Sequence, residues 1–257
     1  MALPHAVRAQ GTALTVYAAG SLRGALTQIG QDFEVSPGGT KVNFVFGASG
    51  LLRDRLQSGE RADVFASANM EHPRTLAETG KAQPVRAFAR NALCALAAPA
   101  FELRGKTLAE RLLDADVKVG ISTPKADPSG DYAFEMFERV ESSGGAPSGS
   151  AARLKAKALQ LTGGPNSPPP PPNRNVYGVL MAEGQADVFI TYCTNAAVAR
   201  KEAPQLQTLA VPEAINVVGS YGLALMQPAS TMSLRFVEFV LGAPGQRRLA
   251  ELGFLPP

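Results

Sequence analysis

Short apolar runs alternate with amphipathic stretches along almost the whole chain. Residues 14–18 form an apolar run that predicts a buried strand, and Leu22, Leu26, Ile29 and Phe33 then recur at helical spacing. The same pattern predicts further strands at 41–46, 63–67, 92–98, 117–121, 187–193, 207–211 and 217–226. It predicts further helices at 51–57, from about Pro73, and at 107–113, 131–142, 151–161, 176–183, 194–202, 230–241 and 244–252.

This alternation predicts an α/β fold of two lobes. Strands that alternate with helices form mainly parallel sheets flanked by helices, and the strands fit two sheets better than one. Residues 92–98 and 217–226 are the expected crossing strands. They would place 10–91 plus 216–257 in lobe 1 and 92–215 in lobe 2. Two crossings make a hinge with a cleft, where ligands sit beside helix N-termini.

One segment, near residues 163–173, interrupts the pattern. It contains Pro165 and a run of five prolines at 168–172, which favours an extended or polyproline II loop. We interpret it as a surface insertion, since such a loop needs no partner to exist; a docking strip for a partner is the alternative.

Composition and charge narrow the class. The chain has 257 residues, which is long enough to bury a hydrophobic core. Its residues are 45% hydrophobic and 18% charged, below the usual quarter, whereas a disordered chain would show the opposite balance. The net charge is only +3, and the basic residues are scattered, which argues against a nucleic-acid partner. No run of 18 or more apolar residues is present, so no membrane-spanning segment is predicted.

Cysteine and histidine are scarce. Cys94, Cys193, His5 and His72 are the whole inventory, which argues against a structural zinc site, because such a site usually takes four Cys or His ligands. The cysteines could pair in an oxidising compartment, but both lie in apolar runs, which favours two buried free thiols. Near the N-terminus, 7–10 resembles a signal-peptidase site with cleavage after Ala9, although the apolar stretch that should precede it is missing.

Two serines follow strands in similar surroundings. Ser21 follows Ala-Ala-Gly after the first strand, and Ser49 follows Phe-Gly-Ala after the second. Serine is a common helix N-cap, and small flanking residues let a ligand approach the backbone. Two helix starts pointing to one place would offer free N–H groups to an anion, so capping and anion binding both stay open.

The predicted second lobe has a comparable set of helix starts. Residues 127–133 form a turn leading into a helix whose N–H groups we expect to be free, and 173–176 open the next helix. Residues 191–196 end a strand and begin another helix. There Tyr192 could lend a hydroxyl to the cleft, although its spacing alone favours a core aromatic residue.

Taken in order, five stretches carry a family resemblance: TVYAAGSL at 15–22, FGAS at 46–49, ADVFASA at 62–68, ITY at 190–192 and GAPGQ at 242–246. From about Leu14 to Phe254 the chain resembles the molybdate-binding subunits of ABC importers. These subunits belong to the type II periplasmic solute-binding proteins. The resemblance implies a two-lobed periplasmic monomer. It would need no cofactor and no bare metal cation, and it would pass molybdate or tungstate to a membrane permease.

The resemblance also implies the ligand set. Hydroxyls and backbone N–H groups alone hold the oxyanion in that family, and the positions fall on Ser21, Ser49, Ser129, Val176 and Tyr192. The loop before Ser129 is shorter than usual, and the proline-rich insertion precedes Val176. These departures bear on the identity of the ligand, which could be a different small anion or an organic solute.

Two other classes of function fit the sequence less well than a binding protein does. A hydrolase using Ser21 or Ser49 would need a base, but His72 is the only histidine outside the N-terminal tail, and neither serine lies in a Gly-x-Ser-x-Gly elbow. The effector domain of a transcription regulator would need a helix-turn-helix, which the sequence does not offer. We therefore predict a binding protein, not an enzyme.

Overall fold

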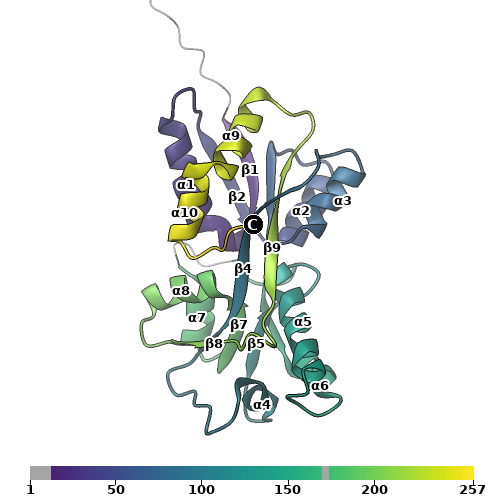
Figure 1. Ribbon diagram of the computed structural model, residues 1–257, viewed down its shortest axis with the longest axis vertical. Helices are drawn as coiled ribbons and strands as arrows, with labels where there is room; N and C mark the ends of the chain where they lie inside the picture. The colour runs from purple at the N-terminus through teal and green to yellow at the C-terminus, as the bar shows by residue number, and fades with distance from the viewer. Residues whose placement is uncertain (1–12, 170–173) are drawn as a thin grey trace, which may run out of the picture.

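The computed structural model describes residues 13–169 and 174–257 (Figure 1). The strands are β1 (Leu14–Ala19), β2 (Val42–Gly47), β3 (Val64–Ser67), β4 (Arg86–Ala97), β5 (Val119–Ser122), β6 (Leu159–Thr162), β7 (Val188–Tyr192), β8 (Gln207–Ala210) and β9 (Val218–Leu225). The helices are a 3-10 turn η1 (Gly20–Leu22), α1 (Arg23–Val35), α2 (Ser49–Gln57), α3 (Glu71–Glu78), α4 (Leu108–Leu113), α5 (Pro128–Ser142), α6 (Ser150–Lys157), α7 (Val176–Ala182), α8 (Cys193–Glu202), α9 (Thr231–Leu241) and α10 (Ala243–Glu251).

Within the described residues, the strands form one continuous sheet in the order β2-β1-β3-β9-β4-β7-β5-β6, with β8 paired to β4. The pairs β1–β2, β1–β3, β5–β6 and β5–β7 are parallel, and the pairings that involve β4 or β9 are antiparallel. The predicted α/β fold with parallel strands is confirmed, but the two sheets that were expected are joined into one, because β4 pairs with both β9 and β7. Its parallel groups lie toward the ends of the sheet and are joined through an antiparallel centre.

The long strand β4 belongs to both ends of this sheet. Residues 86–92 pair with β9, and residues 93–97 pair with β7 and β8. Figure 1 shows α1, α2, α3, α9 and α10 around the strands at one end of β4, and α4 to α8 around those at the other. This arrangement agrees with β4 and β9 as crossing strands. The division into lobes at 91/92 and 215/216 stays a prediction.

Apolar faces of the helices cover the sheet as their periodicity requires. Phe33 of α1 is 2% exposed and packs edge-on against Phe236 and Phe239 of α9, with ring centroids 5.2 and 5.4 Å apart. Fully burying a large apolar side chain contributes about 1.5–3 kcal/mol. The first and penultimate helices are thus held on one face of the β1–β2 end.

The predicted helix at 151–161 is wrong in its second half. α6 ends at Lys157, Ala158 adopts an extended backbone, and β6 follows at Leu159–Thr162. β6 pairs in parallel with β5, a strand some 40 residues away, and Leu159 is 37% exposed at the edge of the sheet. Pairing with a distant strand determines the secondary structure of 158–161, so the helical spacing of its apolar residues predicted the wrong element.

The expectation of two free thiols is also wrong. Cys94 and Cys193 form a disulfide, with an S–S distance of 1.99 Å and a Cα–Cα distance of 4.8 Å. The cause is the antiparallel register of β4 and β7, in which Leu93 pairs with Tyr192 and Cys94 with Thr191. This register brings the end of β7 next to β4, and Cys193, the first residue of α8, then lies within the Cα–Cα range that a disulfide spans.

Two predictions fall wholly or partly outside the described residues. The cleavage site after Ala9 lies in residues 1–12, and residues 170–173 belong to the proline-rich insertion. The described part of that insertion follows β6 at Gly163, whose positive φ of 77° suits glycine. No helix in the described part of the chain has the length and apolar character to cross a bilayer.

Candidate ligand-binding site

Ser21 lies in the 3-10 turn η1, directly after β1. Of the two roles left open for it, capping is wrong, because the N-cap is Ala19 and no side chain caps the turn. The Ser21 hydroxyl instead lies 3.0 Å from the hydroxyl of Tyr221, a residue of β9. The side chain is half-buried. Its polar group is therefore held toward the centre of the sheet, where β9 runs.

Ser49 begins α2, and capping is wrong for it as well. Ala48 is the N-cap, without a side-chain hydrogen bond, and the Ser49 Oγ accepts a hydrogen bond of 3.0 Å from the backbone N–H of Ala68. Ser49 is 1% exposed. Because this oxygen accepts from Ala68, its own proton is left to be donated elsewhere.

Tyr192 ends β7 and meets the same residue from the other side. It is 1% exposed, and its hydroxyl donates to the backbone carbonyl of Ala68 at 3.5 Å. Its ring lies 5.6 Å from that of Tyr221 and 6.3 Å from that of Tyr132. Burial raises its pKa well above the ordinary value, so the phenol stays neutral and able to donate.

These contacts bring three predicted residues into one polar cluster. Ser49 and Tyr192 meet at Ala68, and Ser21 is linked to Tyr192 through Tyr221. We call Ser21, Ser49, Tyr192 and Tyr221 the hydroxyl cluster. Their hydrogen bonds within the described residues are to neutral groups, and so the cluster offers neutral donors rather than fixed positive charges.

Ser129, at the start of α5, departs from its predicted environment. The expected free N–H groups are not free: the Ser129 N–H donates to the Asp127 carboxylate at 3.0 Å, and the Gly130 N–H donates to the Asp127 carbonyl at 2.8 Å. The Ser129 side chain is fully buried, and its hydroxyl has no hydrogen-bond partner among the described residues. A buried hydroxyl without a partner is costly.

Asp127 is the acidic residue of this region. Burial raises its pKa to about 6, and the nearby charge of Asp131 raises it further, whereas the hydrogen bond from the Ser129 N–H lowers it. The preceding residue, Ala126, accepts a 2.8 Å hydrogen bond from the Gly50 N–H at the start of α2. The starts of α2 and α5 are therefore in direct contact.

Val176 is the first residue of α7, so its N–H has no partner within the helix. Asn175 caps this helix through a 3.0 Å bond from the Gly178 N–H. Val176 is half-buried against an apolar cluster that includes Leu96 and Phe189. Within the described residues no hydrogen bond joins it to the other four predicted positions, so the structure does not bring Val176 into the hydroxyl cluster.

The histidine considered as a base does not contact either serine. His72 is 4% exposed, and its Nδ1 lies 3.2 Å from the Arg53 guanidinium. Burial, helped by the Arg53 charge, lowers the pKa of His72 to about 4. In 13–169 and 174–257, no three His, Cys, Asp or Glu side chains are grouped as metal ligands.

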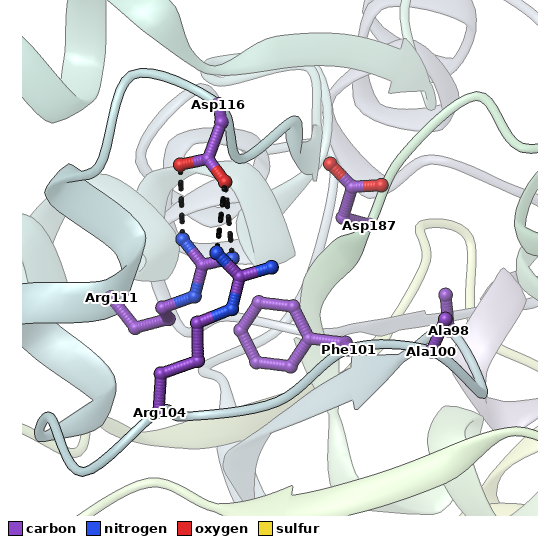
Figure 2. A pocket seen from close by; sticks show the side chains of 7 residues that line it. All are labelled: Ala98, Ala100, Phe101, Arg104, Arg111, Asp116 and Asp187. Carbon is purple, nitrogen blue, oxygen red and sulfur yellow. Dashed lines mark hydrogen bonds and ion pairs between the residues drawn. The ribbon is translucent and has the colours of Figure 1, made fainter.

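A separate cavity of about 180 Å³ lies at the far end of β4 (Figure 2). Arg104 and Arg111 line it, but Asp116 lies 3.8 Å from the first and 3.1 Å from the second. Arg111 also bonds Asp114 at 3.0 Å. Since acidic partners already neutralise its arginines, this cavity is a weak candidate for an anion site.

Residues that the sequence prediction missed complete the hydroxyl cluster. Tyr221 is one of them. Asn91 is another: its amide nitrogen lies 3.4 Å from the Tyr221 hydroxyl and 2.8 Å from that of Thr194. Tyr221 and Asn91 lie within strands, where spacing predicts only burial. Asn91 follows Arg90 at the edge of the apolar run at 92–98, so nothing in the pattern distinguished it from an exposed polar residue.

Comparisons with known proteins identify the family of the chain. The family model described as bacterial extracellular solute-binding protein matches residues 14–255. An uncharacterized protein of Pasteurella multocida is 34% identical over 245 residues, covering 95% of this chain and 98% of that protein. The molybdate-binding protein ModA of Mycobacterium tuberculosis is 30% identical over 250 residues, covering 95% and 85%.

Solved structures share the fold at lower identity. The periplasmic molybdate-binding protein of Azotobacter vinelandii is similar with a TM-score of 0.73 and 19% identity, covering 95% of this chain and 99% of that one. The sulfate-binding protein SubI of Mycobacterium tuberculosis is similar with a TM-score of 0.77 and 18% identity, covering 95% and 87%. At these identities the likeness concerns the fold.

Proposed function

Since the chain belongs to the family of bacterial extracellular solute-binding proteins, we propose that it binds molybdate in the periplasm and delivers it to the membrane permease of an ABC importer. Tungstate, a tetrahedral dianion of the same kind, is the expected second ligand. The 30% identity to a molybdate-binding protein supports this choice of ligand. The sulfate-binding neighbour supports a tetrahedral oxyanion more generally.

The observation that carries the proposal is the hydroxyl cluster. Ser21, Ser49 and Tyr192 come from three separate strand ends, yet their hydroxyls gather around Ala68 and Tyr221. Neutral donors suit an oxyanion whose oxygens are all acceptors, since hydrogen bonds to charged oxygens are stronger than neutral ones. The unpartnered Ser129 hydroxyl and the Val176 N–H would add donors from α5 and α7.

Capture would follow closure of the two lobes, 10–91 plus 216–257 against 92–215. Ser21 and Ser49 lie in the first, and Ser129, Val176 and Tyr192 in the second. The Gly50 N–H bond to Ala126 and the contact of Tyr192 with Ala68 support this closure, because both join the two sets of residues. Hinge closure of this kind encloses a ligand between lobes.

Selectivity would follow from protonation and size. A protonated phosphate carries a donor that would face other donors, an unsatisfied contact costing about 1–3 kcal/mol. Sulfate has no such proton, so cavity size must discriminate against it.

Asp127 favours a second candidate, a small anion or organic solute that carries a proton. A buried carboxylate beside the start of α5 opposes a dianion but would accept a hydroxyl proton from such a ligand. In a comparison of ligands, tighter binding of a protonated anion than of molybdate would favour this candidate.

Calorimetric titration of wild type and matched serine variants tests the proposal. Ser21→Ala and Ser49→Ala should each weaken molybdate affinity by about 1–3 kcal/mol, roughly five- to 150-fold. The melting temperature of the empty protein should stay within a few degrees in Ser21→Ala. It should fall further in Ser49→Ala, because the buried Ala68 N–H loses its acceptor. Ser150→Ala is the control, because Ser150 is as buried as Ser49 but lies at the start of α6. If the two site variants bind like Ser150→Ala, the hydroxyl cluster is not the site.

A further inference from the structure

Tyr221 occupies a fixed position at the centre of the sheet. The residue is fully buried on β9, and its ring packs edge-on against Phe88 and Phe254, at 6.2 and 5.6 Å between centroids. These contacts leave the ring little freedom to turn. Its hydroxyl is therefore held where it is found, 3.0 Å from the hydroxyl of Ser21.

Asn91 gives the hydrogen bonds of this hydroxyl a direction. Its amide nitrogen lies 3.4 Å from the Tyr221 hydroxyl, and an amide N–H can only donate. The Tyr221 oxygen therefore accepts from Asn91, while either hydroxyl can supply the proton between Tyr221 and Ser21. When Tyr221 supplies it, Ser21 accepts from Tyr221, and the Ser21 proton is available to a ligand.

The same amide ties the chain of hydrogen bonds to α8. The Asn91 nitrogen donates to the Thr194 hydroxyl at 2.8 Å, and Thr194 lies two residues after Tyr192. Between them stands Cys193, which the disulfide holds to β4. One buried asparagine on the shared strand thus connects Ser21 with the segment that carries Tyr192.

We propose that Tyr221 is a positioning residue for the ligand, which holds the Ser21 hydroxyl as a hydrogen-bond donor with its direction set by Asn91. The proposal rests on the oxyanion-binding function and sharpens it. A serine hydroxyl has one proton and two lone pairs, so one that accepts from Tyr221 keeps its proton for a ligand. The site would then select anions whose oxygens are all acceptors, and successive hydrogen bonds in one direction strengthen each other.

Calorimetric titration of a double-mutant cycle tests this role. Tyr221→Phe removes one oxygen and should weaken molybdate affinity about tenfold. Because Tyr221 acts through Ser21, adding Tyr221→Phe to Ser21→Ala should cause little further loss. The selectivity for molybdate over phosphate at pH 6 should also fall, since a freed Ser21 can accept from a protonated anion.

Two further variants make the result decisive. Tyr17→Phe is the control, because Tyr17 is a buried tyrosine of β1 whose hydroxyl bonds Glu60 and Arg55 instead. Asn91→Leu removes the directing amide while leaving Tyr221 in place, and should lower molybdate affinity and selectivity in the same sense.

The outcomes separate this inference from the proposed function. If wild type binds no oxyanion, the proposed function fails, and this inference fails with it. If wild type binds molybdate but Tyr221→Phe binds it like Tyr17→Phe, the positioning role alone is overturned. The same holds if the fold-losses of affinity in Tyr221→Phe and Ser21→Ala multiply fully in the double variant. If Tyr221→Phe does not fold, unchanged affinity and selectivity in Asn91→Leu overturn it.

Discussion

The disulfide makes a quantitative prediction about stability. Cys94 and Cys193 are separated by 99 residues, so the bond closes a loop of about 100 residues in the unfolded chain. Chain entropy assigns such a loop up to about 4.7 kcal/mol, and measured disulfides typically contribute about 2–4 kcal/mol. The double variant Cys94→Ala/Cys193→Ala should therefore lose about 2–4 kcal/mol of unfolding free energy, a large part of the usual 5–15 kcal/mol.

Urea unfolding followed by circular dichroism measures this loss. Oxidised wild type, reduced wild type and the double variant should be compared at one pH. The dependence of free energy on urea should also become steeper without the bond, because the unfolded chain becomes less compact. Molybdate affinity should stay within about threefold, since pairing of Leu93 with Tyr192 holds the backbone beside the bond.

Two results would refute this reasoning. Free energies that agree within about 0.5 kcal/mol across the three samples would show that the bond contributes little. A loss of stability without a change in the urea dependence would locate the effect in the folded state, not in the unfolded chain.

Three further predictions concern buried charge and close packing. Burial lowers the pKa of His72 from 6.5 to about 4, so its contribution to stability is present above pH 6.5 and is lost as the pH falls through 4. His72→Gln should therefore reduce the drop in unfolding free energy between pH 7 and 4.5 by about 2 kcal/mol. An unchanged drop in urea titrations would contradict this. Burial raises the pKa of Asp127 from 3.8 to about 6, so its contribution to stability is present below pH 3.8 and is lost as the pH rises through 6. Asp127→Asn should raise the melting temperature at pH 8 but not at pH 3.5, and it should strengthen molybdate binding at pH 8. Equal shifts of the melting temperature at both pH values would argue against a charge effect. In Gly50→Ala the new Cβ would lie 2.6 and 2.8 Å from the Lys125 and Ala126 carbonyl oxygens. Because this clash would hinder closure of the two lobes, calorimetry should show molybdate affinity at least tenfold weaker. Wild-type affinity would mean that the contact of Gly50 with Ala126 plays no part in binding.

The fold could be predicted to a large extent because its main signals are local. The apolar run at 14–18 and the periodic Leu22 to Phe33 appear as β1, η1 and α1 with nearly the expected bounds. Helix 151–161 failed at its second half, where pairing of β6 with β5 overrides the local pattern. Local periodicity specifies an amphipathic helix but does not reveal a partner strand far away in the chain.

The candidate site was harder to predict because its contacts are long-range. The sequence indicated Ser21 and Ser49 by their small neighbours and left capping and anion binding open, whereas their partners in the structure, Tyr221 and Ala68, were not predicted. The partner of Ser21 is 200 residues away. The disulfide depends in the same way on the register of β4 and β7, which no spacing within either strand reveals.

The most direct test of the account is a crystal structure of the protein grown with molybdate, with anomalous scattering used to locate molybdenum. The account predicts one strong anomalous peak within the hydroxyl cluster, with oxyanion oxygens within hydrogen-bond distance of Ser21, Ser49 and Tyr192. A peak in the cavity beside Arg104 and Arg111, or no peak alongside measured binding of another solute, would contradict it.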